Sequence, residues 1–331
     1  MAKALTALTD TCRIGLGCMN LSHAYGVSTP EADAVRLLNR ALDLGYNHLD
    51  TAALYGFGAN ETLLGKAVMH RRDEFFLASK CGMFKGPDGK RLIDGRPEAL
   101  RRVCDEALQR LGVEHIDLYY LHRWDKSVPI EESVGTLADL KQEGKIGAIG
   151  LSEVSAATLR KAHREHPIAA VQTEYSLWTR NPEIAVLDAC RELGATFVAF
   201  SPVARGMLTD AMPDPDRLID SDLRRNMPRF QAEHFAANRQ AIEGMQAVAK
   251  RTGYTTAQLA LAWVLSRGEH IVAIPGTTSQ VHLEENFQAK DLNLSADVLA
   301  ELDRLVNRDT IHGPRYNAAT QAEIDTEEFT A

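Results

Sequence analysis

One strand-helix-strand unit can be read in residues 116–151, which run IDLYYLHRWDKSVPIEESVGTLADLKQEGKIGAIGL. Its two ends, 116–121 and 146–151, are short runs of apolar, aromatic and β-branched residues, as is typical of buried strands. The stretch between them has a helical pattern that ends before Gly144, and glycine readily enters the left-handed conformation that closes a helix. The segment therefore predicts one unit of a repeating βα architecture.

The same alternation recurs along almost the whole chain. Eight short apolar runs predict strands at residues 14–17, 47–50, 75–79, 116–121, 146–151, 169–173, 196–200 and 271–274. A glycine closes the helical pattern before a strand at five places, Gly45, Gly112, Gly144, Gly194 and Gly268. Eight such units close into a (β/α)8 TIM barrel, which takes about 250 residues. We therefore predict an α/β protein with a single barrel domain over residues 1–331, with long active-face loops and extra helices.

Two segments of the sequence do not belong to the eight strand-helix units. Residues 203–237 form an insertion rich in Pro, Asp and Arg, and an extra helical pattern follows near 238–252. Residues 307–331 form an irregular C-terminal tail. Long segments of this kind in a compact domain are commonly lids over a binding site. We expect both to fold over the mouth of the barrel; the alternative for each is a disordered surface loop.

Composition and charge narrow the class of protein. The chain of 331 residues is 45% hydrophobic and 25% charged, with a formal net charge of −8, which is typical of a globular protein and opposes nucleic-acid binding. No apolar run reaches the roughly 18 residues of a membrane span, and the first residues lack a signal peptide's apolar core. We therefore expect a cytoplasmic protein without a membrane partner. The five cysteines and eleven histidines have no metal-binding spacing, so we predict neither disulfides nor a metal.

A dinucleotide-binding domain of the Rossmann type is the competing fold. The run Ile14-Gly15-Leu16-Gly17 precedes a helix, and Asp50 ends the next strand where a ribose-binding acid would lie. However, Asn20 stands where the fingerprint needs its third glycine. The helix also begins about a dozen residues after the second glycine, too late for its N-terminus to hold a pyrophosphate. The barrel is therefore the better interpretation.

Polar side chains gather at the carboxyl ends of the predicted strands, which form the active face of such a barrel. They are Asp50, Lys80, His122, Ser152, Gln172, Ser201 and the run Gly276-Thr277-Thr278, with Tyr55 in the loop after the second strand. Taken singly, each has an ordinary structural explanation, such as a turn cap, a solvated charge or a core histidine. Their convergence on one rim favours a catalytic site.

This set of side chains suits the reduction of a carbonyl group. A tyrosine has a pKa near 10, and a neighbouring cation that lowers this pKa makes it a better proton donor to an alkoxide. Lys80 would supply the cation, and Asp50 would keep that lysine charged in an apolar pocket. His122 would donate a hydrogen bond to the substrate oxygen. We expect Tyr55 to give the proton while a nicotinamide cofactor gives a hydride to carbon.

The motifs of the chain closely resemble those of the aldo-keto reductase family from about Ile14 to Asn307. The matching runs are GYNHLDTAALYG at 45–56, SK at 79–80, DLYYLH at 117–122, IGLS at 149–152 and IPGT at 274–277. A branch similar to the pyridoxal and perakine reductases is indicated by GLSEV at 150–154, QTEYSLW at 172–178 and PRFQ at 228–231. The resemblance implies an NAD(P)H-dependent oxidoreductase that reduces an aldehyde or a ketone to the alcohol.

The resemblance also implies roles for individual residues. The implied catalytic tetrad is Asp50, Tyr55, Lys80 and His122, with Tyr55 as the general acid. The implied cofactor-binding residues are Ser152 and Gln172 at the nicotinamide carboxamide, Phe200 against the nicotinamide ring, Ser201, Pro202, Val203, Arg205, Gly206 and Leu208 in the loop over the pyrophosphate, and Gly276, Thr277, Thr278, Gln280, Glu285 and Asn286 at the adenosine end.

The chain departs from the family pattern at three positions. Many relatives have Asn where this chain has Glu153, which puts the third carboxamide contact in doubt. Many also have a lysine at the position of Gly276 and an arginine at that of His282, a clamp for the 2′-phosphate that is absent here. We expect NADP(H) as the cofactor, with Arg205 or another loop cation compensating; NAD(H) is the alternative.

Other functions and the substrate stay open at this point. The same resemblance extends to channel-associated β-subunits, so an NADP(H)-sensing binding module is the alternative function. A Schiff-base aldolase that uses Lys80 is a third hypothesis, which the neighbouring Asp50 opposes. We expect a small-molecule carbonyl substrate of undecided identity, and the oligomeric state is undecided too. Candidate substrate-pocket residues are Tyr25, Leu54, Met83, Trp124 and Trp178.

Overall fold

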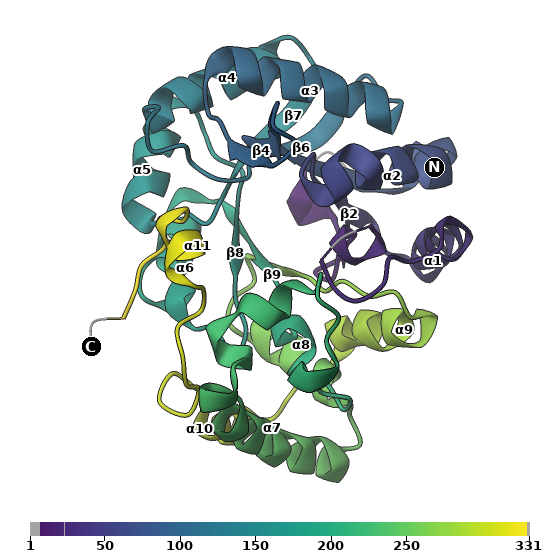
Figure 1. Cartoon of the computed structure of the whole chain (residues 1–331), viewed down its shortest axis with the longest axis vertical. Helices are drawn as coiled ribbons and strands as arrows, with labels where there is room; N and C mark the ends of the chain where they lie inside the picture. The colour runs from purple at the N-terminus through teal and green to yellow at the C-terminus, as the bar shows by residue number, and fades with distance from the viewer. Residues whose placement is uncertain (1–6, 23, 330–331) are drawn as a thin grey trace.

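The computed structural model describes residues 7–22 and 24–329, and it shows a (β/α)8 barrel (Figure 1). Within these residues, eight parallel strands lie in the order β1-β2-β3-β6-β7-β8-β9-β10. Their bounds are Leu16–Gly17, His48–Asp50, Phe76–Cys81, Ile116–Leu121, Ile146–Ser152, Ala170–Glu174, Thr196–Phe200 and Ile271–Ile274. A parallel bridge between Ile14 and Ala273 joins the two ends of the sheet. The eight predicted strands are confirmed; residues 1–6 and 330–331 of the predicted domain lie outside the described residues.

Helices cover the outside of the barrel (Figure 1). In the described chain, the helices that follow the barrel strands are α1 Glu31–Leu44, α2 Ala59–Val68, α3 Pro97–Leu111, α4 Ile130–Gln142, α5 Ala156–Glu165, α6 Val186–Leu193, α8 Thr256–Ser266 and α9 Gln280–Gln288. The connections and the tail add α7 Ala232–Thr252, α10 Ala296–Leu305, α11 Ala318–Ala322 and a hairpin of β4 Met83–Lys85 and β5 Arg91–Ile93. The hairpin follows β3 and borders the carboxyl face of the barrel.

Local sequence explains where these helices form and stop. In α1, the buried residues Ala34, Leu37, Leu38 and Ala41 recur every three or four positions, which places them on the one face that packs against the strands. Of the five glycines predicted to follow helices, Gly45, Gly112, Gly144 and Gly194 have positive φ angles. Gly268 also lies between α8, which ends at Ser266, and β10, but the prediction of a left-handed conformation was wrong there. This glycine instead lets the ring of His270 approach the backbone closely.

The strands separate two apolar layers, because successive side chains point to opposite faces of a sheet. One layer packs between the strands and the surrounding helices. The other fills the barrel and consists of Leu8, Phe76, Ala78, Leu118, Tyr120, Ala170, Val198 and Ile274. Lys80, His122 and Gln172 each stand two residues after one of these inner positions, namely Ala78, Tyr120 and Ala170, and therefore point to the same side of the sheet. The inner row therefore changes from apolar to polar at the carboxyl end of the barrel.

Two long segments border this carboxyl end. After β9, residues 204–230 form four short 3-10 turns before α7 begins at Ala232. The tail follows α10 and crosses the loops after β6 and β7, as the yellow segment in Figure 1 shows. There Lys126 donates hydrogen bonds to the carbonyls of Ala322 (2.9 Å) and Ile324 (2.8 Å). The amide of Asp325 donates to the carbonyl of Glu153 (3.0 Å).

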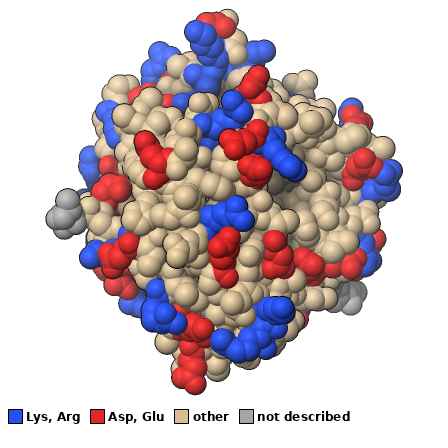
Figure 2. All heavy atoms as spheres, turned by 60° about the horizontal axis from the view of Figure 1, so that its bottom comes forward, with Lys and Arg blue, Asp and Glu red and all other residues tan. Residues whose placement is uncertain are grey.

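The exterior carries charges of both signs. Figure 2 shows Lys and Arg side chains interspersed with Asp and Glu on one face of the molecule. Among the described residues, we find no helix that combines the length and the apolar character needed to span a bilayer.

The packing inside the barrel predicts the effect of adding one methyl group. A Cβ at Gly150 of β7 would lie 2.3 Å from the ring of Tyr120, its partner on β6. Gly150→Ala is therefore expected to lower the free energy of unfolding by about 1 to 3 kcal/mol, as overpacking usually does. Gly135→Ala in α4 is the control, because its Cβ would meet nothing closer than 3.8 Å; it should be neutral or stabilise by up to about 1 kcal/mol. Urea unfolding of both variants measures this, and equal stabilities would contradict the described packing.

Candidate active site

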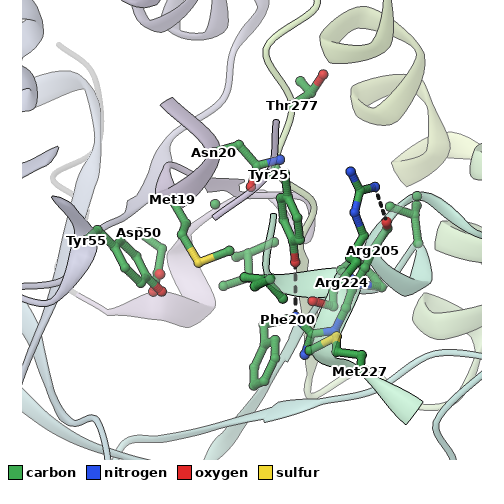
Figure 3. A pocket seen from close by; sticks show the side chains of 18 of the residues that line it. Met19, Asn20, Tyr25, Asp50, Tyr55, Phe200, Arg205, Arg224, Met227 and Thr277 are labelled. Carbon is green, nitrogen blue, oxygen red and sulfur yellow. Dashed lines mark hydrogen bonds between the residues drawn. The ribbon is translucent and has the colours of Figure 1, made fainter. Parts of the chain in front are cut away.

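A pocket of about 880 Å³ opens at the carboxyl ends of the barrel strands (Figure 3). The predicted residues that line it are Tyr25, Asp50, Leu54, Tyr55, Met83, His122, Ser152, Gln172, Phe200, Ser201, Pro202, Val203, Arg205, Gly206, Gly276, Thr277, Thr278, Glu285 and Asn286. The described residues 201–227 and 316–320 contribute to its walls. The pocket is thus formed by the barrel rim together with the insertion and the tail.

A buried ion pair lies at the base of the pocket, where Asp50 lines the pocket and Lys80 lies behind it without lining it. Lys80 on β3 is fully buried, Asp50 on β2 is 1% exposed, and the lysine ammonium donates a hydrogen bond to the Asp50 carboxylate. Lys80 also donates to the carbonyl of Thr51 at 2.8 Å. Burial alone would lower the pKa of Lys80, but the Asp50 carboxylate and the Tyr55 hydroxyl hold that pKa above its ordinary value. The lysine is therefore a cation at neutral pH.

Tyr55 lies at the start of a 3-10 turn, η3 (Tyr55–Gly58), that follows β2. Its hydroxyl oxygen lies 3.2 Å from the nitrogen of Lys80 and accepts a hydrogen bond from it. We expected Lys80 to lower the pKa of this phenol. Burial instead raises the pKa of Tyr55 above its ordinary value, and the charge of Lys80 opposes this shift without cancelling it. The phenol is consequently protonated at neutral pH.

His122 follows β6 and faces Tyr55 across the pocket. The two rings meet edge to face, with centroids 5.9 Å apart and planes at 87°. Burial and the charges of Arg123 and Lys80 hold the pKa of His122 well below its ordinary value, so the imidazole is neutral. Its Nδ1 atom is buried and has no hydrogen-bond partner in the structure. A neutral ring of this kind can donate from one nitrogen and accept at the other.

Ser152 and Phe200, the last residues of β7 and β9, and Gln172, in the middle of β8, line the pocket beside the ion pair. The amide nitrogen of Gln172 donates a hydrogen bond of 2.7 Å to the second carboxylate oxygen of Asp50. This bond occupies one donor of Gln172, and the side-chain oxygen is the group that can face a ligand. Figure 3 shows Phe200 among the side chains that line the pocket.

Glu153, which we expected to depart from the asparagine of many similar proteins, does not line the pocket. Its side chain is 1% exposed and forms a buried ion pair with Arg315 of the C-terminal tail. Its other carboxylate oxygen accepts a hydrogen bond of 2.9 Å from the amide of Glu174. The departure from the family pattern therefore converts a position at the rim into an anchor for the tail.

Arg205 is not the free cation that the sequence led us to expect. It donates to the carboxylate of Glu174 (2.6 Å) and to the hydroxyls of Tyr25 (3.0 Å) and Tyr316 (3.1 Å). Although burial favours the protonated acid, the charges of Arg205 and Arg315 hold the pKa of Glu174 below its ordinary value. The insertion, which carries Arg205, and the tail, which carries Arg315, are thus held by the same carboxylate of β8.

The far end of the pocket lies at the start of α9. Gly276 approaches the neighbouring strand β1 closely, because a Cβ there would lie 2.9 Å from the carbonyl of Gly17. Ser279 caps the helix by accepting a hydrogen bond from the amide of His282, and His282 lines the pocket. Gln280 does not line it; this exposed side chain borders a second cavity. Leu208 does not line it either, because it is fully buried in the core.

Two of the predicted substrate-pocket residues are absent from the pocket. The indole nitrogen of Trp124 donates to the carbonyl of Val128 at 2.8 Å, which holds that ring within its own loop. Trp178 is 4% exposed and packs against Phe230, with ring centroids 6.3 Å apart. Both tryptophans are therefore packing residues.

Sequence reasoning also missed several residues of the pocket wall. They are Met19, Asn20, Phe57, Arg91, Arg123, Leu223, Arg224, Asn226, Met227, Tyr316, Asn317 and Thr320. Arg123 is the one with a sequence signal, because it directly follows His122 at the end of a barrel strand. Met19 and Asn20 lie in the loop after β1, and Phe57 lies in the turn after β2. The remaining residues reach the pocket through the hairpin, the insertion or the tail, and local patterns do not place such segments.

The chain is similar to known proteins over most of its length. The sequence model of the Aldo/keto reductase family matches residues 13–307. The chain is 44% identical over 310 residues to the probable aldo-keto reductase 1 of Glycine max, covering 93% of this chain and 89% of that protein. It resembles the structure of a glycerol dehydrogenase from Gluconobacter oxydans at 28% identity, with a TM-score of 0.84 and coverage of 96% and 98%. It also resembles an aldo/keto reductase from Klebsiella pneumoniae in complex with NADP and acetate, at 27% identity, with a TM-score of 0.71 and coverage of 95% and 94%.

The buried network at the rim predicts how stability depends on the tail. Arg315→Met leaves the carboxylates of Glu153 and Glu174 short of a buried partner, so the free energy of unfolding is expected to fall by about 3 to 5 kcal/mol. Arg308→Met is the control, because Arg308 is an exposed tail residue paired with Asp309 at 3.4 Å; it should cost less than about 1 kcal/mol. Denaturant unfolding compares the two. A loss below 1 kcal/mol for Arg315→Met would contradict the buried network.

Proposed function

The chain belongs to the aldo/keto reductase family, and on this premise we propose that its pocket reduces an aldehyde or a ketone to the alcohol with Tyr55 as the proton donor. The enzyme class, an NAD(P)H-dependent oxidoreductase, follows from the family. One observation carries the proposal for the residues: the hydroxyl of Tyr55, which lines the pocket, lies 3.2 Å from the ammonium of Lys80. This ammonium lies behind the pocket and is itself paired with Asp50. This arrangement places a protonated phenol beside a fixed cation.

The pocket suits NADP(H), with which a Klebsiella relative was solved. At the barrel end, Ser152, the side-chain oxygen of Gln172 and the ring of Phe200 present the donors, acceptor and flat surface that a nicotinamide carboxamide and ring need. Gly17 and Gly276 both line the pocket and lie close to each other, so the pocket is bounded there by backbone and not by a side chain. We propose that the nicotinamide lies against Phe200 and that the adenosine lies near Asn286 and the first turn of α9.

The 2′-phosphate of NADP(H) needs a site for an anion. The first turn of α9 offers backbone amides at the positive end of a helix dipole. Thr277, Thr278 and His282 line the pocket at this place. We propose that hydroxyl and amide donors here replace the lysine and arginine that many relatives use, whereas Arg205 takes no part because its guanidinium is bound to Glu174.

The remaining roles follow from charge and hydrogen bonding. Bound NADPH supplies a hydride to the carbonyl carbon. Tyr55 donates its proton to the carbonyl oxygen, and the Lys80 ammonium stabilises the phenolate that remains. The neutral imidazole of His122 donates a hydrogen bond to the same oxygen and fixes its orientation. Asp50 keeps Lys80 charged and accepts a hydrogen bond from Gln172, so it couples the proton donor to the cofactor wall.

We propose further that the chain falls in the branch similar to pyridoxal and perakine reductases. Two of the motifs that suggested this branch are in contact, because Arg229 donates to the carbonyl of Trp178 at 2.5 Å. The Schiff-base alternative is disfavoured, since the pKa of Lys80 is held above its ordinary value by Asp50 and an amine must lose its proton to attack a carbonyl. An NADP(H)-sensing module with little turnover is the alternative that the next experiment excludes or supports.

Removing the proton donor tests the proposed chemistry. Tyr55→Phe is expected to lower kcat for aldehyde reduction by about 10² to 10⁴-fold, the usual contribution of a positioned acid, while NADPH still binds. Tyr46→Phe is the matched control, because it removes a buried hydroxyl that bonds the carbonyl of Leu283 outside the pocket; its kcat should be unchanged. The readout is NADPH oxidation across a panel of aldehydes and ketones. Full activity of Tyr55→Phe would remove Tyr55 from the mechanism, and no activity of the wild-type chain would favour the sensor.

The pH profile gives a second test. A proton donor must be protonated, so reduction is expected to slow as pH rises through the pKa of Tyr55, which burial places above its ordinary value of 10. The pKa of His122 lies well below its ordinary value, so protonation of His122 should cause no inflection near pH 6.5. We therefore expect kcat to be flat from about pH 6 to about pH 9. An inflection near pH 6.5 that disappears in His122→Phe would contradict a neutral His122.

A further inference from the structure

Arg123 occupies a position in the pocket that the reaction as described does not use. It directly follows His122 at the end of β6, is 9% exposed and lines the pocket wall. One terminal nitrogen of its guanidinium donates to the carbonyl of His122 (2.7 Å) and, at 3.4 Å, to the hydroxyl of Ser152. Its Nε is buried and has no hydrogen-bond partner.

The other arginines of the pocket all have carboxylate partners. Arg205 is paired with Glu174, Arg224 with Asp222, and Arg91 with Glu323. Within residues 7–22 and 24–329, Arg123 forms no ion pair with an aspartate or a glutamate. Among the pocket arginines of the described residues, Arg123 is therefore the one without an acidic partner.

Such an arrangement is costly unless a ligand completes it. A charge withdrawn from water needs a partner of opposite sign, and a buried donor without an acceptor lowers stability. The second terminal nitrogen of Arg123 is not buried and has no hydrogen-bond partner in the described chain, so it is the group that can donate to a carboxylate oxygen. The unmet requirement of Arg123 is thus for an anionic group with acceptor oxygens.

The charge of Arg123 acts on the centre of the proposed reaction. It is among the causes that lower the pKa of His122, and it also acts on Tyr55. Because Arg123 directly follows His122 and lines the same pocket as His122 and Tyr55, a ligand group at Arg123 would lie near a carbonyl bound by these two residues. The apolar side chains of Leu54 and Met83 line the same pocket and suit the carbon skeleton between the two polar ends.

We propose that the preferred carbonyl substrate carries a carboxylate, which Arg123 binds while the carbonyl oxygen lies between Tyr55 and His122. This inference rests on the proposed reductase function. Arg123 is then a specificity-determining residue, and the substrate class is that of oxo acids and carboxylated aldehydes. The competing role is purely to hold Ser152 in place for the cofactor, in which case substrate charge would not matter.

Two matched substrate pairs separate these roles. Each pair consists of an anionic aldehyde and its uncharged methyl ester: 4-oxobutanoate with methyl 4-oxobutanoate, and 3-carboxybenzaldehyde with methyl 3-formylbenzoate. The measured quantity is kcat/KM for NADPH-dependent reduction, expressed as the ratio of acid to ester. We expect the wild-type ratio to exceed 1 for at least one pair, since a hydrogen bond to a charged group usually contributes about tenfold or more.

Variants of Arg123 then assign this preference to the residue. Arg123→Met should lower the acid-to-ester ratio by about tenfold or more, and Arg123→Lys should retain part of it because the charge remains. Arg239→Met is the control, because Arg239 is an exposed residue of α7 and its loss changes the net charge equally; the ratio should not change. The dissociation constant for NADPH, measured by fluorescence, reports separately on the Ser152 contact.

Each outcome decides the proposal. A wild-type ratio at or below 1 for both pairs, or a ratio unchanged in Arg123→Met, overturns it. Weaker NADPH binding in Arg123→Met with an unchanged ratio assigns Arg123 to the cofactor instead. Failure of the reductase function itself would be recognised differently, as the absence of NADPH oxidation with every acid and every ester in the wild-type enzyme.

Discussion

The buried ion pair between Lys80 and Asp50 is the constraint on which the rest of the site depends. Two charges that are almost fully withdrawn from water are stable only while they face each other with their remaining hydrogen bonds satisfied. The pairing of β2 with β3 brings these side chains into the barrel interior, and the carbonyl of Thr51 and the amide of Gln172 complete their hydrogen bonds. The strands thus hold a cation beside the phenol of Tyr55, where bulk solvent does not screen it.

The same principle fixes the outer wall of the pocket. Glu153, which directly follows β7, and Glu174, the last residue of β8, are buried acids. Their partners, Arg205 and Arg315, come from the insertion and from the tail. Residues 204–230 and the described part of the tail contain only short 3-10 turns and the five-residue helix α11. These charge pairs therefore help to hold both segments against the barrel. The glutamate that replaces the family's asparagine is therefore explained by its partner Arg315, a tail residue some 160 positions away in the sequence.

Periodicity and strand ends were enough to predict the barrel and the residues around Tyr55. Side chains alternate along a strand, and the carboxyl ends of all barrel strands meet at one face, so Asp50, Lys80 and His122 could be placed together from local patterns. Contacts between residues far apart in the sequence determine the other positions. Trp178 packs in the core, and Arg205 forms an ion pair with Glu174 of β8. The pKa of Tyr55 was misjudged because burial, which a sequence does not display, outweighs the nearby lysine. Arg123 was overlooked because its lack of a partner becomes visible only when the other pocket charges are paired.

The coupling between the lysine and the phenol is the central claim, and a double-mutant cycle measures it most directly. The quantity is kcat for carbonyl reduction in Lys80→Met, in Tyr55→Phe and in the variant that combines them. If Lys80 acts through the hydroxyl of Tyr55, each single change costs about as much as both together, because residues that act as a unit are not additive. We expect the combined variant to be within a few-fold of Tyr55→Phe. Losses that multiply across the two positions would contradict a shared role and would separate the lysine from the proton donor.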